Sequence, residues 1–135
     1  DKVAINEIIE FAKKYNLTDK GFKYVSISLD SLDITEIDKC RFLIGITVPY
    51  SMEVPKGFGT LNIQAGLYSV FNIKGGNHEL NKIYRNVYLD WLPNSKYRLR
   101  EQMTFEIYAN TPDKTSTDEL VTEIYLPIEA KQKIK

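Results

Sequence analysis

The chain has 135 residues, and its 18 Lys and Arg residues balance 18 Asp and Glu residues. That length fits a single domain, residues 1–135, with a buried core. The neutral balance argues against nucleic-acid binding by this chain, which normally needs a basic excess, and no apolar run is long enough for a membrane helix. The single cysteine, Cys40, cannot form an internal disulfide, which predicts a reducing, cytoplasmic compartment.

Helical and strand patterns alternate in the first half of the chain. Apolar residues at helical spacing predict a short amphipathic helix over residues 3–16. Strict alternation of apolar and polar residues then predicts strands over residues 22–30 and 40–49. Proline and glycine mark residues 50–59 as a loop.

The second half has one more element than the first. We predict a strand over residues 60–73, a helix with a wide apolar stripe over 77–92, and strands over 97–109 and 119–128. If both helices cover one face of the sheet, that face should bury Val25, Ile27, Phe42, Ile44, Leu61, Ile63, Phe105, Ile107, Ile124 and Leu126.

The chain also repeats its own pattern at a shift of 80 residues. Residues 25–35 fall on residues 105–115, and each copy has an alternating strand, an Asp/Asn-rich turn and a second strand. The period is too long for a solenoid and indicates a duplicated module, with one copy in residues 1–50 and the other in 60–130. We therefore predict an α+β fold of strand–helix–strand–strand modules. They should form a curved antiparallel sheet with helices on one face, and the first strand of the first module is missing.

The other face of the predicted sheet has an unusual composition. Tyrosines alternate with small residues and two carboxylates, where a solvated face usually carries Lys, Glu, Thr and Arg. A carboxylate between aromatic rings suits a flat organic cation. The simpler alternative is that Glu106 and Glu123 are solvated surface residues. A tryptophan at helical spacing, such as Trp91, is more often a core residue than a ligand contact. The candidate ligand-binding residues are Glu106, Tyr108, Tyr68, Tyr125, Glu123, Tyr24 and Trp91.

Other chemistry has little support in the sequence. His78 is the only histidine and stands at a predicted helix start, which is its more ordinary explanation. One histidine and one cysteine make no zinc-like cluster. We therefore expect no metal, no cofactor and no catalytic group other than Glu106.

Several motifs in order resemble the GyrI-like (gyrase-inhibitor-like) family over about residues 3–129. The same domain is the effector-binding domain of many AraC-type and MerR-type bacterial transcription regulators. The resemblance rests on Gly66-Leu67-Tyr68-Ser69-Val70-Phe71, Lys74-Gly75, Tyr88 to Trp91-Leu92-Pro93, Phe105-Glu106-Ile107-Tyr108 and Glu123-Ile124-Tyr125-Leu126-Pro127-Ile128.

The resemblance implies a small-molecule site between the two halves. Glu106 matches the pocket carboxylate of multidrug-sensing relatives, and Glu123 and Tyr125 match pocket positions on the last strand. The implied function is an effector-binding domain for organic cations or multiple drugs, which would reach DNA only through a domain absent from this chain. The alternatives are a hydrolase of reactive small molecules with Glu106 as general base, and a gyrase-binding inhibitor. The missing strand should leave an unpaired edge, which predicts a homodimer.

Overall fold

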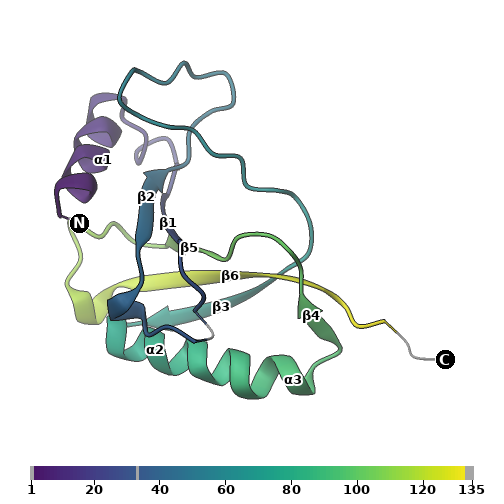
Figure 1. The fold of residues 1–135 in the computed structure, drawn as a ribbon. Helices are drawn as coiled ribbons and strands as arrows, with labels where there is room; N and C mark the ends of the chain where they lie inside the picture. The colour runs from purple at the N-terminus through teal and green to yellow at the C-terminus, as the bar shows by residue number, and fades with distance from the viewer. Residues whose placement is uncertain (1, 33, 133–135) are drawn as a thin grey trace.

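The computed structural model describes residues 2–32 and 34–132, and it is an α+β fold around one antiparallel sheet (Figure 1). The strand order is β2-β1-β5-β6-β3, and the short β4 pairs with β6 outside this path. The strands are β1 (Tyr24–Ser28), β2 (Phe42–Ile46), β3 (Tyr68–Lys74), β4 (Tyr97–Leu99), β5 (Phe105–Tyr108) and β6 (Val121–Ala130). The helices are α1 (Lys2–Lys14), α2 (Asn77–Asn86) and α3 (Leu92–Asn94), with short turns η1 (Ile37–Lys39) and η3 (Thr117–Glu119) and a π-helix η2 (Val87–Trp91).

The elements recur at the shift of 80 residues. The shift carries β1 onto β5, η1 onto η3 and β2 onto the first half of β6. β1 and β5 pair with each other at the centre of the sheet, so the two halves meet there. β3 covers the outer edge of β6, whereas β2 pairs only with β1 within the part of the chain that the structure describes. β2 is therefore the open edge at which the repeat lacks a strand.

The two longer helices lie at different ends of the sheet. α2 runs beneath β3 and β6, and α1 lies beside the edge strand β2 (Figure 1). Leu80 and Tyr84 of α2 form a core cluster with Ile124 of β6 and Ile37 of η1. Since η1 belongs to the first half and α2 to the second, this cluster joins the two copies.

Two predicted elements differ from the structure. The strand predicted over 60–73 begins only at Tyr68, and Leu61 and Ile63, which we expected to be buried, are 54% and 38% exposed. Their alternation has no neighbouring strand to pair with, and Gly66 interrupts the extended chain with φ of 151°. The strand predicted over 97–109 is divided into β4 and β5.

The assignment of sheet faces was wrong by one residue in β1 and β5. Glu106, and not Phe105 or Ile107, points toward α2, because Tyr84 of that helix bonds to its carboxyl group. Phe105 is nonetheless buried, in a second cluster with Val25 and Ile27 on the opposite face. Apolar alternation could not distinguish the faces here because both are covered in this part of the sheet.

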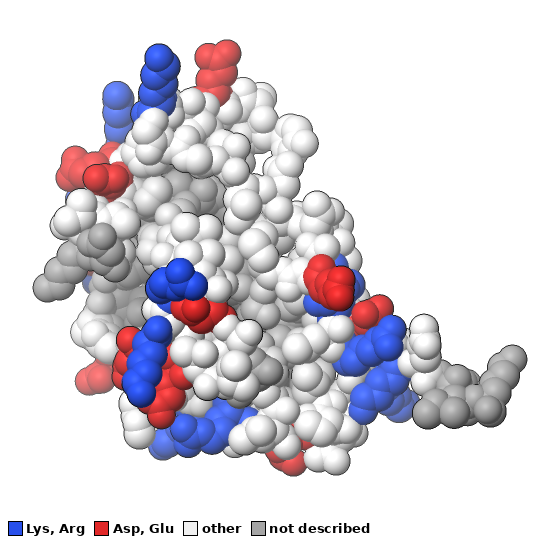
Figure 2. Space-filling model, in the orientation of Figure 1, with Lys and Arg blue, Asp and Glu red and all other residues white. Residues whose placement is uncertain are grey.

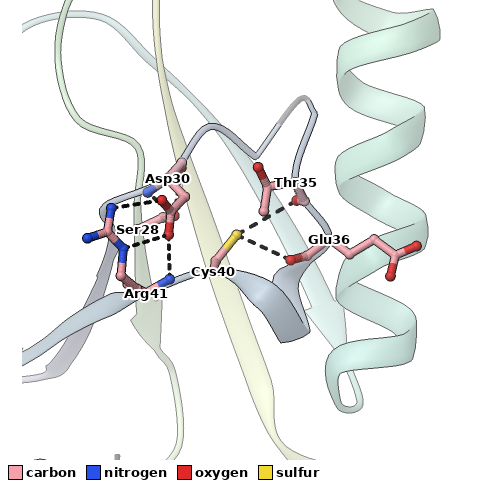
Figure 3. A network of polar contacts seen from close by, with 6 residues as sticks. All are labelled: Ser28, Asp30, Thr35, Glu36, Cys40 and Arg41. Atoms are coloured by element: carbon pink, nitrogen blue, oxygen red, sulfur yellow. Dashed lines mark hydrogen bonds and ion pairs between the residues drawn. The ribbon is translucent and has the colours of Figure 1, made fainter.

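A polar network fixes the turn that leads from β1 to β2 (Figure 3). The Arg41 guanidinium and backbone N–H donate to the Asp30 carboxylate, with the Arg41 Nη2–Asp30 Oδ1 pair at 3.0 Å. The Cys40 thiol donates to the carbonyl oxygen of Glu36 at 3.3 Å. Asn81 of α2 accepts the Ile37 N–H at 2.8 Å, so the turn is held against the helix.

Charged side chains are mixed on the molecular surface. Lys and Arg lie next to Asp and Glu at several places on the face drawn in Figure 2. Two of the ion pairs in the described residues are Lys74–Glu119 at 3.0 Å and Arg98–Glu129 at 3.5 Å, both between exposed side chains. Such pairs contribute little to stability individually.

Candidate functional site

A carboxyl group is buried at the boundary between the two halves of the fold. Glu106 of β5 is 3% exposed and stands between Ser26 of β1 and Ile124 of β6 in the strand register. The hydroxyl of Tyr84 reaches down from α2 and donates to Glu106 Oε2 at 2.5 Å. Ser26, in the first half of the chain, thus forms one wall of the site, whereas Glu106 and the covering Tyr84 both belong to the second half.

The charge state of Glu106 follows from this burial. Loss of solvation raises the pKa of its carboxyl group, and the hydrogen bond from Tyr84 opposes that rise without cancelling it. Burial, followed by the charge of Glu106, raises the pKa of Tyr84 and raises that of Tyr108 to about 12. None of the ion pairs in the described residues includes Glu106. Within residues 2–32 and 34–132 the carboxyl group therefore has hydroxyl and apolar neighbours and no basic partner.

Two further tyrosines and a threonine share the face of Glu106. Tyr108 stands opposite Thr122 of β6, and continuing the β1–β5 register by one residue places Tyr24 opposite Tyr108. Burial, with a smaller contribution from the charge of Asp113, raises the pKa of Tyr24. Thr122 is fully buried, and its Oγ1 is the buried side-chain atom in the described residues without a hydrogen-bond partner.

The structure divides the predicted site residues between the two faces. Glu106, Tyr108 and Tyr24 lie together on the face toward α2, as the shared alternation of β1 and β5 indicated. Tyr125 lies on the opposite face, because its direct partner across the strands is Phe105. Tyr68 and Glu123 share that opposite face by the register of β3 and β6.

The second group forms an aromatic cluster of its own. The ring of Tyr125 stacks on that of Phe105 at 4.8 Å, and Tyr68 meets both rings edge-on. The guanidinium of Arg100 lies 4.8 Å from the centre of the Tyr68 ring. Burial and the nearby charge of Glu123 raise the pKa of Tyr125. These contacts place the group away from Glu106.

Trp91 is also separate from the buried carboxyl group. Its ring meets Phe71 edge-on at 5.1 Å and stacks over Tyr97 at 6.4 Å. It is a half-buried member of the cluster around Val87 and Leu126. Its contacts are those of a packing residue in the π-helix.

The candidate residues predicted from the sequence do not include Tyr84, whose hydroxyl donates to the Glu106 side chain. In the sequence Tyr84 stands in the apolar stripe that predicts the helix over 77–92. A signal was present, because a tyrosine hydroxyl that is buried usually has a polar partner. The sequence has a tyrosine within the apolar stripe of a helix and a glutamate within an apolar strand. This combination could have identified Tyr84 and Glu106 as hydrogen-bond partners.

The surface has one cavity beside α2 and another beside α1. A cavity of about 250 Å³ lies between the turn at residues 32–37 and α2, and Tyr84 lines it with Asn81 and Arg85. A larger one, of about 890 Å³, lies between α1 and the loop around Pro55 and Phe58. None of the predicted site residues lines either cavity. Tyr84 both lines the smaller cavity and donates to Glu106, so we place the candidate site at Glu106 and this cavity.

A family model for the GyrI-like small molecule binding domain matches residues 2–129. The chain belongs to this family. The match spans both halves of the fold and includes Glu106, Tyr84 and the turn at Ile37. No curated protein matches the chain at a significant level.

The described residues offer neither a membrane-spanning helix nor a metal site. No helix there is both long enough and apolar enough to cross a membrane. Residues 2–32 and 34–132 contain no group of three or more His, Cys, Asp and Glu side chains arranged to hold a metal ion.

Proposed function

We propose that this GyrI-like domain binds small organic cations at Glu106, and that it acts as the effector-binding domain of a bacterial transcription regulator. The single observation that carries the proposal is a carboxyl group that is 3% exposed, lies near tyrosines and has no basic partner in the described part of the chain. A buried charge without a partner costs free energy. A ligand that brings the opposite charge removes that cost and gains contact with the aromatic rings.

The cavity beside Tyr84 supports an entry route. It lies between the turn at η1 and the helix α2, and Tyr84 belongs both to its wall and to the hydrogen bond with Glu106. Because Glu106 itself is buried, a ligand reaches the carboxyl group only if the Tyr84 side chain or α2 moves aside. Binding is therefore coupled to the position of α2, which is the kind of two-state element that an effector can bias.

The π-helix supports movement at this place. η2 follows α2 directly, and single-turn π-helices occur frequently at functional sites. α2 is also held to the first half of the fold through few polar contacts, Asn81 with Ile37 and Asn77 with Asp38, both at 2.8 Å. A shift of α2 would change the contact between the halves, and a regulator could transmit that change to a DNA-binding domain.

The proposal is tested with two ligands of the same shape. N-methylquinolinium is a permanent aromatic cation, and 1-methylnaphthalene is its neutral isostere. Replacing the carboxyl by an amide in Glu106→Gln keeps the size of the side chain and removes its charge. A charge-assisted contact contributes roughly 1.5–3 kcal/mol, so affinity for the cation should fall about tenfold or more. Affinity for the neutral isostere should barely change.

Glu123→Gln is the matched control, because Glu123 lies on the other face beside Tyr125. It should leave both affinities unchanged. Equal affinity of the wild type and Glu106→Gln for the cation would rule out the counter-ion role of Glu106. A loss of cation binding in Glu123→Gln alone would instead move the site to the aromatic cluster of Phe105, Tyr68 and Tyr125.

A further inference from the structure

The groups that face Glu106 are all neutral in their ordinary states at neutral pH. From α2 it meets the Tyr84 hydroxyl, from its own strand Tyr108, and from β1 the Ser26 side chain. β6 contributes the apolar Ile124. A further titratable neighbour in the described residues is the Cys40 thiol, whose pKa is raised first by burial and also by the charge of Glu106.

Two charged side chains beside Cys40, Asp30 and Arg41, are engaged with each other in the ion pair described above (Figure 3). The Arg41 side chain of this pair is exposed. Among the described residues, the groups that shift the pKa of the Glu106 carboxyl group include no Lys, Arg or His. An ionised Glu106 would thus be a buried negative charge, stabilised within this part of the chain by the hydrogen bond from Tyr84.

We propose that Glu106 is a proton-exchanging site, in which each organic cation that binds displaces one proton from the Glu106 carboxyl group. This inference rests on the proposed function and goes beyond it, because a fixed counter-ion would bind the same cation without releasing a proton. The ligand-free protein holds a neutral carboxylic acid under α2, and the complex holds a carboxylate paired with the cation.

The charges balance in this exchange. One positive charge enters with the ligand, one proton leaves the Glu106 oxygen for the buffer, and the net charge of the site stays at zero in both states. No covalent bond of the ligand changes. Tyr84 donates to the carboxyl group in the ligand-free protein, and its hydroxyl remains available to the carboxylate oxygen once the proton has left.

The physical cause of the exchange is desolvation. In a site of low polarity the neutral form of a carboxyl group is favoured unless an opposite charge is present, and burial accordingly raises the pKa of Glu106. A bound cation reverses the preference by direct attraction at short range. The cation and the proton thus compete for one carboxyl group, so acid weakens cation binding.

The experiment measures N-methylquinolinium binding to the wild-type chain by titration calorimetry from pH 5.5 to 9. At each pH, two buffers that both have a pKa near that pH but differ in heat of ionisation report the number of protons released. Because this cation has no titratable proton, every proton released comes from the protein. We expect nearly one proton per cation on the acid side, and an affinity that rises about tenfold per pH unit before it levels off.

Two controls separate the failure of this inference from the failure of the proposed function. With 1-methylnaphthalene the wild type should release no proton at any pH. Glu106→Gln should bind the cation weakly, with no pH dependence and no proton release. Cation binding that depends on Glu106 but is flat from pH 5.5 to 9 and releases no proton overturns the exchange and leaves the counter-ion role intact. Cation binding that is absent, or unchanged in Glu106→Gln, overturns the proposed function and the exchange together.

Discussion

The hydroxyl of Tyr84 donates a hydrogen bond of 2.5 Å to the carboxyl group of Glu106, and neither side chain is more than 3% exposed. The two residues come from opposite layers of the fold, the helix α2 and the strand β5. Their contact therefore links α2, which covers the candidate site, to the buried carboxyl group of Glu106. A substitution at either residue should change the environment of the other.

The first prediction concerns stability as a function of pH. Because burial raises the pKa of Glu106 in the folded protein, the folded state binds more protons than the unfolded state above the ordinary value of 4.5. The free energy of unfolding should thus fall as pH rises from there through the folded pKa, by about 1.4 kcal/mol for each unit that separates the two pKa values. Glu106→Gln should remove this slope.

Urea denaturation between pH 4.5 and 9 checks the prediction. The wild type and Glu106→Gln should have curves that separate as pH rises, with the variant the more stable at high pH. Glu123→Gln, on the other face of the sheet, should follow the wild type. Parallel curves for the wild type and Glu106→Gln would mean that the folded carboxyl group has an ordinary pKa.

The second prediction removes the hydrogen bond alone. Tyr84→Phe deletes the donor that favours the charged form of Glu106, so the pKa of Glu106 should rise further. Carboxyl-carbon NMR of Glu106 across a pH series measures this directly. The variant should also lose about 1–3 kcal/mol of stability, because a buried acceptor is left without its partner. Tyr68→Phe is the matched control, since the Tyr68 hydroxyl donates to the exposed Gln64 carbonyl. A Glu106 titration that Tyr84→Phe leaves in place would show that the bond has no influence on the charge.

Much of the fold could be predicted because its patterns are local or repeated. The shift of 80 residues in the sequence is the shift that relates β1 to β5 and η1 to η3. Helical spacing located α1 within two residues at each end and located the start of α2, whereas the helix predicted over 77–92 also includes the π-helix η2 after Asn86. Alternation wrongly predicted a strand in the segment before Tyr68. An alternating sequence is compatible with a strand, but it does not show whether a neighbouring strand is available to pair with it.

The candidate site was predictable in part for a similar reason. Alternation correctly grouped Tyr24, Glu106 and Tyr108, since residues two apart on paired strands share a face. It failed for Tyr125 because the pairing register between β5 and β6 is a tertiary property. Alternation also predicted the wrong sheet face for α2. Polarity suggested that Phe105 alone would be buried beneath a helix, but Phe105 and Glu106 are both buried, on opposite faces.

The third prediction concerns the unpartnered hydroxyl of Thr122. Thr122→Val keeps the shape of the side chain and removes a buried polar atom that has no partner in the described residues. The variant should be more stable than the wild type, by about 1 kcal/mol, because the cost of desolvating that hydroxyl disappears. Thr47→Val is the control, and it should lower the stability, because Thr47 Oγ1 accepts a hydrogen bond from the Lys23 N–H at 3.0 Å. Thermal denaturation of both variants measures the two effects, and a loss of stability in Thr122→Val would mean that the hydroxyl does have a partner.

The last prediction concerns the open edge of the sheet. β2 is in contact with α1 but pairs with β1 on one side only within the described residues, and an edge strand with unpaired backbone groups can pair with another chain. We propose that this chain, studied by itself, forms a dimer through β2. The extended segment at residues 60–66, exposed and rich in alternating apolar residues, is a suitable added strand. The segment lies outside the assigned strands and leads within two residues into β3, at the edge of the sheet opposite β2.

Sedimentation equilibrium over a range of concentrations tests this dimer. Leu43→Lys places a charge on β2 at a side chain that is already 47% exposed, so it should favour the monomer without unfolding the chain. Leu89→Lys makes the same change at a position 69% exposed in the π-helix and should leave the association unchanged. If the wild type stays monomeric at high concentration, or if both variants dissociate the dimer equally, β2 is not the surface through which the chains associate.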